Sequence, residues 1–204
     1  MKKLLLTGLL LTVFTSVSYA STITLTAVLS GPAEAPPNAS PGTGFATVTI
    51  DTVAHTLRVQ STFSGLLSPT TASHIHCCVV PPGTAGVATT TPSFVGFPLG
   101  VTAGSMDQTY DTLSAGTYNP AFVTANGGTA GSAEAALFSG LLAGQAYLNI
   151  HTTQFGGGEI RGFLVVQPTV VTPEPATLGL LGLGLAAVWA VGRRRRTGVS
   201  EPLR

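Results

Sequence analysis

Charged side chains are scarce in this chain, and basic ones are scarcer still once its two ends are set aside. Lys and Arg number 9 and Asp and Glu 8 among 204 residues. Between residues 21 and 172 the only basic residues are Arg58 and Arg161, against six acidic ones, which gives this part a net charge of −4 with histidine neutral. Nucleic-acid binding depends on a basic face that contacts phosphates. The composition therefore excludes nucleic acid as a partner.

Recognisable catalytic motifs are also lacking. The sequence contains no Gly-x-Ser-x-Gly elbow, and the carboxylates of Asp107 and Asp111 lie in a Thr/Gln-rich segment without a recognisable partner. A dismutase with a two-metal centre needs more ligands than the four histidines of the chain, one of which, His55, lies apart at a hairpin end. We therefore expect a protein that is not an enzyme.

Cysteine is limited to one adjacent pair, Cys77 and Cys78. In an oxidising compartment thiols tend to pair. Neighbouring residues of a regular strand point to opposite faces, however, and this opposes a bridge between them. Three states stay open: a vicinal disulfide, a bridge between molecules, and free thiols that are buried or face a metal.

The N-terminus has the pattern of an export signal. Lys2 and Lys3 form a positive segment, residues 4–17 are apolar, and Ser18-Tyr19-Ala20 is the small-x-small pattern that a signal peptidase cleaves. We interpret residues 1–20 as a signal peptide that is removed after Ala20.

The C-terminus has three parts in a fixed order. Pro173-Glu174-Pro175 ends a linker over residues 168–175, an uncharged apolar run follows over residues 176–192, and Arg193-Arg194-Arg195-Arg196 begins a basic tail over residues 193–204. The run is long enough to cross much of a bilayer as a helix, and an arginine cluster prefers the cytoplasmic side. The pattern predicts a transmembrane helix at 176–192 and a cytoplasmic tail at 193–204.

This tail resembles the PEP-CTERM sorting signal of Gram-negative bacteria. The resemblance implies recognition by an exosortase, removal of the helix and arginines from an inner-membrane-anchored intermediate, and release to the cell surface or an extracellular matrix. The alternative is a permanent single-span anchor. Residues 197–204 depart from the pattern, because such tails usually stop sooner after the arginines.

The remaining residues 21–167 suit one domain with one core. Their apolar residues alternate with period 2 in segments rich in β-branched residues and bounded by Gly, Pro, Asn and Asp, which is the signal for strands. No stretch shows a helical period, so we expect an all-β domain, an antiparallel Greek-key β-sandwich. The expected strands cover residues 22–29, 44–51, 57–63, 73–80, 108–113, 132–138, 145–152 and 159–166.

Two long inserts interrupt the strands, at residues 32–43 and 80–106. Loops of this length in a compact domain are usually functional or ordered by their own packing. The second insert contains Phe94 and Phe97. We expect both rings to pack onto the edge of the sandwich rather than to form an exposed aromatic platform.

A short internal repeat suggests two related halves. Phe63-Ser64-Gly65-Leu66-Leu67 recurs as Phe138-Ser139-Gly140-Leu141-Leu142, and Ile-His follows each copy at the same interval, as Ile75-His76 and Ile150-His151. Equal spacing on a pleated chain predicts equivalent positions for the two histidines in two similar Greek-key units.

Three histidines of the domain are candidate metal ligands. His74 and His76 project to one face of a strand, as do Tyr147, Asn149 and His151 on theirs. If the two strands are neighbours, the imidazoles of His74, His76 and His151 converge, and three imidazoles with an open position suit Zn or Cu. We expect Glu159 as an outer-shell partner. The alternative is that the histidines are structural groups, hydrogen-bonded to backbone and loop atoms.

These segments carry a second resemblance. Ser73-His74-Ile75-His76, residues 146–152 and Gly158-Glu159-Ile160-Arg161-Gly162 are similar to the signature segments of the CHRD domain. The resemblance covers most of residues 23–166 and implies an immunoglobulin-like or superoxide-dismutase-like β-sandwich. The segment that begins at Cys77 departs from the family pattern, in which glycine-rich residues follow the His-x-His. Any function that depends on this loop is therefore not carried over.

Glu159 and Arg161 alternate with apolar residues and share a face of the last strand. We interpret them as a structural clasp, an ion pair or a set of hydrogen bonds that ties this strand to a loop.

Two functions follow from these patterns. The first is an exported structural or interaction module of the cell surface or extracellular matrix, with exopolysaccharide or surface proteins as partners. The second is a small periplasmic or extracellular protein that binds Zn or Cu, or is redox-active, through His74, His76, His151 and Cys77-Cys78. We favour the first, because the sorting motifs are more specific than the site motifs.

Overall fold

The computed structural model describes residues 22–168 and 175–196, and the chain divides into two compact units, 1–167 and 168–204. The first unit holds the β-domain and the second holds one helix, and each is described by itself. The signal peptide expected at residues 1–20 lies outside the described residues. The same is true of Pro173 and Glu174 of the sorting motif and of the tail beyond Arg196.

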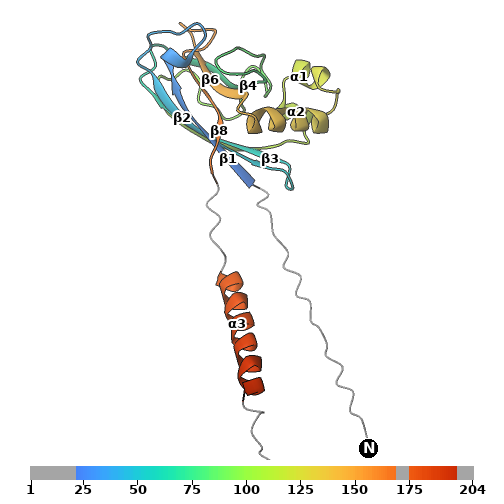
Figure 1. Cartoon of the computed structure of the whole chain (residues 1–204). Coiled ribbons are helices and arrows are strands. Elements are labelled where there is room, and N and C mark those ends of the chain that lie inside the picture. Colours follow the sequence, from blue (N-terminus) through green and yellow to red (C-terminus); the bar gives the residue numbers. More distant parts are fainter. Residues whose placement is uncertain (1–21, 169–174, 197–204) are drawn as a thin grey trace, which may run out of the picture. The chain divides into compact units, whose positions relative to one another are not determined.

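The β-domain is built on one antiparallel sheet (Figure 1). Neighbouring strands follow the order β4-β6-β7-β1-β2-β3-β5. The short strand β8 pairs with β1 in addition. The strands are β1 (Thr22–Ser30), β2 (Thr43–Asp51), β3 (Thr56–Ser64), β4 (Thr70–Cys77), β5 (Gly104–Asp111), β6 (Ala146–Thr152), β7 (Ile160–Phe163) and β8 (Val165–Val166).

Alternating side chains explain the first hairpins of the sheet. In β1 the side chains of Leu25, Ala27 and Leu29 are buried, whereas Thr26 between them is half-buried and Val28 is exposed. Leu25 is the cross-strand partner of Val48, which is also fully buried. Each such Leu or Val contributes about 1.5–3 kcal/mol to the free energy of unfolding. Burial of one face therefore fixes the register of these strands.

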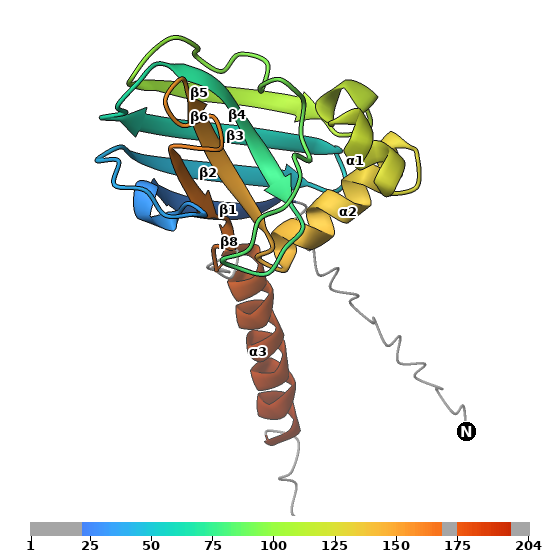
Figure 2. The same cartoon turned by 90° about the horizontal axis from the view of Figure 1, so that it is seen from above.

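The sheet curls so strongly that its β4–β6 end lies across the face of β2 and β3 (Figure 2). The core between these parts is made by fully buried side chains from both, including Val48, Val59, Ile75, Leu148 and Ile150. The expectation of antiparallel strands is confirmed. The two separate sheets of a sandwich are not found, because β7 pairs with β6 on one side and with β1 on the other and so joins the two parts into one sheet.

Two helices in the β-domain correct the sequence analysis. They are α1 (Pro120–Ala125) and α2 (Ala130–Leu142), and α2 replaces the strand expected at residues 132–138. Its sequence is rich in alanine, the best helix former. Ala133, Leu137 and Leu141 are fully buried and lie four residues apart. This spacing is the periodicity of a helix, in place of the alternation expected for a strand.

The start of α2 has a capping box. The Thr129 hydroxyl accepts from the Ser132 backbone N–H at 3.1 Å, and the Ser132 hydroxyl accepts from the Thr129 backbone N–H at 3.2 Å. These two bonds satisfy N–H groups that the first helical turn leaves without partners. Ser132 therefore belongs to a helix start rather than to a strand.

The expectation of two equal halves is wrong. The first copy of the repeat begins at the end of β3 and continues into a loop through Gly65, whose φ of 70° is in the left-handed region. The second copy, residues 138–142, lies inside α2. The same five-residue sequence therefore adopts two structures. Its tertiary surroundings, rather than its own secondary-structure preference, determine its conformation.

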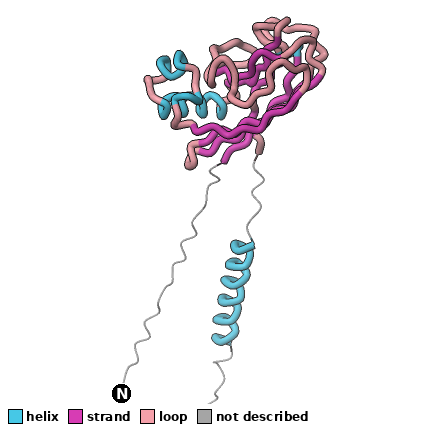
Figure 3. Tube along the Cα trace, turned by 180° about the vertical axis from the view of Figure 1, so that it is seen from behind, coloured by secondary structure: helices cyan, strands magenta, loops and turns pink. Residues whose placement is uncertain are grey.

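The insert after β4 is ordered by its own aromatic side chains, as expected. Phe94 is 3% and Phe97 is 6% exposed. The Phe94 ring stacks on Tyr110 at 5.3 Å and the Phe97 ring on Phe63 at 5.5 Å, measured between centroids. Loop segments such as this one cover much of the sheet (Figure 3). The Phe94 N–H also donates to the carbonyl of Ser73 at 3.0 Å, which holds the insert against β4, where His74 and His76 lie.

The second unit contains α3 (Pro175–Arg196), a helix over the apolar run and the four arginines. Within residues 22–168 and 175–196, no helix combines the length and the apolar character that crossing a membrane requires. The transmembrane segment expected at residues 176–192 stays a prediction.

Candidate functional site

Antiparallel pairing of β4 with β6 brings the three candidate histidines onto one face of the sheet. His74 is the cross-strand partner of Asn149, His76 of Tyr147, and Ala72 of His151. Since side chains alternate along a strand, His74 and His76 share a face with the side chain of His151. The pairing that the sequence analysis required is present.

The three imidazoles lie close together and are nearly covered. One ring nitrogen from each of His74, His76 and His151 lies within 4.8 Å of the other two. Ring centroids are 5.0 Å apart for His74 and His151 and 5.7 Å apart for His74 and His76. Each residue is between 6% and 8% exposed.

Each ring is fixed by a backbone carbonyl. His74 Nε2 donates to Pro92 O at 2.6 Å and His76 Nδ1 donates to Ala85 O at 2.9 Å. His151 Nδ1 donates to Gly156 O at 3.0 Å. A carbonyl only accepts, so the proton of each neutral ring is on the bonded nitrogen and the other nitrogen carries a lone pair.

The nitrogens with lone pairs are buried and have no hydrogen-bond partner. They are Nδ1 of His74, Nε2 of His76 and Nε2 of His151. A buried polar atom without a partner costs about 1–3 kcal/mol. Three such atoms in one cluster call for an explanation, because native proteins leave few buried polar groups unsatisfied.

Burial keeps the three rings neutral. Removal from water lowers the pKa of His74 and His76, and it lowers the pKa of His151 to about 4, with further lowering from the neighbouring His74. Neutral imidazole is the form that binds a metal. At neutral pH the cluster therefore presents three nitrogen donors.

A second layer of residues supports His76. The ring of Tyr147 stacks on His76, with centroids 4.8 Å apart, and the guanidinium of Arg161 lies 4.8 Å from the Tyr147 centroid. The Tyr147 hydroxyl donates to Ala85 O at 3.3 Å and accepts from Ala85 N–H at 3.2 Å. Tyr147 thus holds the same loop residue that fixes the His76 ring.

Arg161 is fully buried and ties β7 to two loops. Its guanidinium donates to the carbonyls of Ala33 at 2.6 Å, Pro82 at 2.8 Å and Gly83 at 3.2 Å. Nε also lies 3.8 Å from Oε2 of Glu34. Burial raises the pKa of Glu34 to about 7, and the charge of Arg161 opposes this shift.

Glu159 makes a separate set of bonds. Its Oε1 accepts from the Ser40 hydroxyl and from the Leu67 N–H, both at 2.6 Å. Its Oε2 accepts from the Thr152 hydroxyl at 2.7 Å. Glu159 therefore bonds to Ser40, Leu67 and Thr152, whereas the three imidazole rings bond to backbone carbonyls.

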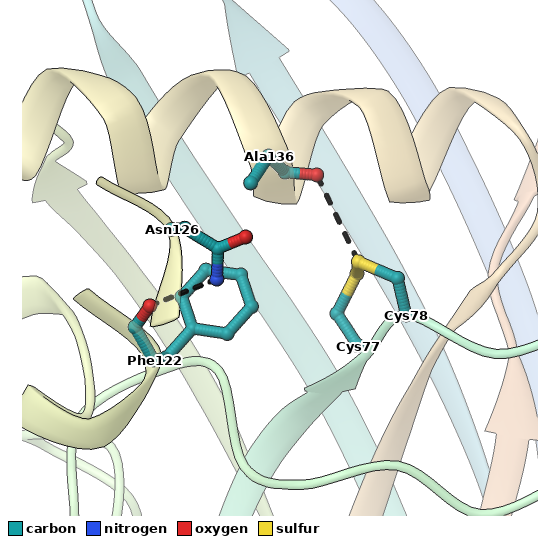
Figure 4. The surroundings of a disulfide bond; sticks show 5 residues. All are labelled: Cys77, Cys78, Phe122, Asn126 and Ala136. Carbon is teal, nitrogen blue, oxygen red and sulfur yellow. Dashed lines mark hydrogen bonds between the residues drawn. A yellow bond between two sulfur atoms is a disulfide. The ribbon is translucent and has the colours of Figure 1, made fainter. Parts of the chain in front are cut away.

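Cys77 and Cys78 are joined by a disulfide that lies under α2 (Figure 4). Sγ of Cys78 lies 3.8 Å from the carbonyl oxygen of Ala136. A Cβ atom at Gly140 would overlap both sulfur atoms and lie 3.2 Å from the Cys78 Cβ. The helix can pack on the disulfide because residue 140 has no side chain.

Asn149 lies at the centre of this face, between His74 on β4 and Arg161 on β7. Its Oδ1 and the Oε1 of Glu34 are buried without partners. Both oxygens lie next to Gly158. A Cβ atom added there would lie 2.5 Å from Oδ1 of Asn149 and 2.6 Å from Oε1 of Glu34. Sequence alternation placed Asn149 on the histidine face, but nothing in the sequence pointed to Glu34.

Two family models match the chain. The CHRD domain matches residues 25–164, and the PEP-CTERM protein-sorting motif matches residues 171–196. No curated protein and no solved structure matches it.

Proposed function

The chain belongs to the CHRD domain family, and we propose that its domain binds a transition metal, zinc or copper, through His74, His76 and His151. The PEP-CTERM motif implies processing by an exosortase and sorting to the cell surface. The metal would then be held by a surface protein.

One observation carries the proposal: each ring of this three-histidine cluster has one buried nitrogen without a partner, while its opposite nitrogen is bonded to a carbonyl. Metal-binding histidines typically donate their second N–H to a carbonyl or carboxylate, which fixes the ring and its tautomer. A purely structural histidine gains nothing from leaving its other nitrogen buried and unsatisfied. A bound cation would satisfy all three at once.

The cluster supplies three ligands, which leaves one position of a tetrahedral metal for water or another small ligand. The rings use Nδ1 of His74 and Nε2 of His76 and of His151. Zinc and copper are the metals that imidazole donors suit best among those common in proteins.

Metal analysis of the purified full-length protein tests the proposal. We expect about one Zn or Cu per chain, lost in His74→Ala and in His151→Ala and kept in His55→Ala. His55 is the matched control, because its ring bonds Glu134 at 2.9 Å, away from the cluster. If the wild-type protein takes up neither metal when they are added, the proposal is wrong, whatever the variants do.

A second function, as an interaction module of the cell surface, is favoured by the outer face of β2, β3 and β5. A shallow cavity of about 370 Å³ lies there, lined by Phe45 among hydroxyl and amide side chains such as Thr47, Gln60 and Thr62. Phe45 is 46% exposed. A pull-down of surface material tests this function. We expect the wild-type protein to recover bound material and Phe45→Ser to recover none. Equal recovery by both proteins would exclude this face as the binding surface.

The sorting route has its own test. Localisation of the protein, together with the intact mass of its mature form, reports both processing events. We expect a surface protein whose mass lacks residues 1–20 and the segment after the Pro-Glu-Pro motif. A full-length polypeptide in the cytosol would contradict this route.

A further inference from the structure

We infer that the three-histidine site selects Cu(I) over divalent zinc. This inference rests on the proposed metal site and names its occupant. It follows from the charge of the donors, from the burial of the site and from the number of ligands that it supplies.

All three donors are neutral. Among the residues that the structure describes, the metal-capable cluster on this face consists of His74, His76 and His151, with no carboxylate or thiolate in it. A bound Zn²⁺ would keep its full charge of two in a site whose ligands are between 6% and 8% exposed. The desolvation cost of an ion rises steeply with its charge, so Cu(I), with a charge of one, is favoured.

Two buried carboxylates of this sheet end, Glu34 and Glu159, contact groups other than the histidines. Oε2 of Glu34 lies 3.8 Å from Nε of Arg161, whose positive charge faces it. Both oxygens of Glu159 accept hydrogen bonds from Ser40, Leu67 and Thr152. Neither carboxylate belongs to the metal-capable cluster, so neither adds a negative charge to its donor set.

The cysteines do not supply the missing charge either. Cys77 follows His76 directly, but a neighbouring strand residue points to the opposite face. The two sulfur atoms are bonded to each other and lie against Gly140 of α2. A disulfide offers no thiolate, so the donor set stays neutral as long as the bridge is intact.

Coordination number points the same way. Zinc in proteins is almost always four-coordinate, with water as the fourth ligand where the protein supplies three, whereas three imidazoles suffice for Cu(I). The three rings are each fixed by a carbonyl, at Pro92, Ala85 and Gly156, and the cluster is nearly closed to solvent. Three fixed ligands complete the coordination of Cu(I), whereas zinc would have to retain a water molecule in a site that is nearly closed to solvent.

Competition titrations of the full-length protein test the inference. Cu(I) is titrated without oxygen against bicinchoninate, and Zn²⁺ against a chromophoric zinc chelator at the same pH, without thiol reductants that would open the disulfide. We expect one Cu(I) per chain, with a dissociation constant at least about tenfold lower than that of Zn²⁺. Equal or tighter zinc binding overturns the inference and leaves the proposed metal site standing. Failure to bind either ion overturns the proposed function itself.

A charge variant tests the cause. Asn149→Asp adds a carboxylate of nearly the same shape beside His74, its cross-strand partner. We expect the preference for Cu(I) over Zn²⁺ to fall by about tenfold, because one added negative charge stabilises the divalent ion more. Gln108→Glu is the matched control, since it adds the same charge at an exposed position of β5 and leaves the ratio unchanged. An unchanged ratio in Asn149→Asp, with the fold intact by circular dichroism, would contradict the charge argument.

Discussion

The rings of His76 and Tyr147 lie parallel, with centroids 4.8 Å apart and an angle of 4° between their planes. The two residues are cross-strand partners on β4 and β6. Both also bond to the carbonyl of Ala85, His76 through Nδ1 at 2.9 Å and Tyr147 through its hydroxyl at 3.3 Å. The orientation of one candidate ligand is thus fixed by a strand neighbour and a loop together.

Removing the Tyr147 ring should weaken metal binding without abolishing it. We expect Tyr147→Leu to raise the dissociation constant of the metal about tenfold, as loss of outer-shell support does. Tyr147→Phe keeps the stacking and loses only the bonds to Ala85, so its effect should be smaller. Titration of both variants, with melting curves to verify folding, measures the difference. Wild-type affinity in Tyr147→Leu would exclude a role for this ring in positioning His76.

Arg161 should be essential to stability. Arg161→Ala removes the donors to the carbonyls of Ala33, Pro82 and Gly83 and leaves Glu34 buried without its cation. We expect the free energy of unfolding to fall by about 3–5 kcal/mol, because three buried carbonyls lose their donor and Glu34 loses its partner. Denaturant unfolding measures this loss. Melting unchanged from wild type would refute the structural clasp.

As the matched control, Arg58→Ala removes the exposed arginine that pairs with Asp107 at 2.6 Å. Both partners of that pair are about half exposed. Such exposed surface pairs contribute little to stability, so Arg58→Ala should unfold almost like the wild type.

Glu34 should make the domain less stable at higher pH. Its pKa is raised from 4.5 to about 7 by burial, so the folded protein binds more protons than the unfolded chain between these values. Stability contributed by Glu34 therefore falls as the pH rises from about 4.5 to about 7 and stays low above it. In Glu34→Gln this part of the pH dependence should vanish, and the variant should be the more stable protein at pH 8. Chemical unfolding of both proteins at pH 5, 6, 7 and 8 tests this. If the free energy of unfolding changes with pH equally in both proteins, the prediction is wrong.

Gly140 should not tolerate a methyl group. In Gly140→Ala the new Cβ would overlap both sulfur atoms of the disulfide, and we expect a loss of about 1–3 kcal/mol from overpacking. Gly131→Ala, in the same helix, meets open space and should be neutral or stabilising by up to about 1 kcal/mol. Thermal melting of the two variants compares them. If Gly140→Ala melts no lower than Gly131→Ala, the helix does not pack tightly on the disulfide.

The parts predicted well from sequence are those governed by local alternation. β1, β2 and β3 follow the pattern of buried and exposed residues, and the same alternation placed His74, His76 and His151 on one face. The pairing of β4 with β6 was then enough to bring them together.

One missed element has a local cause, and the other missed features depend on contacts between distant segments. The strand expected at residues 132–138 is helical, because its alanines and cap outweigh the short alternation read there. The carbonyls that fix the rings, at Pro92, Ala85 and Gly156, lie in loops whose path no periodicity describes. Whether the strands form one sheet or two was likewise decided by β7, which has only four residues.

β8 has a mechanical consequence. It pairs with β1 through two residues only, Val165 and Val166, and is the last strand before the chain leaves the domain. Any pull on a C-terminal tether enters the fold here, as shear on a ladder of two residue pairs. The next element back along the chain is β7, the neighbour of the histidine-bearing β6. A load on the tether would therefore reach β7 and then β6, so holding force and metal retention are expected to fail together.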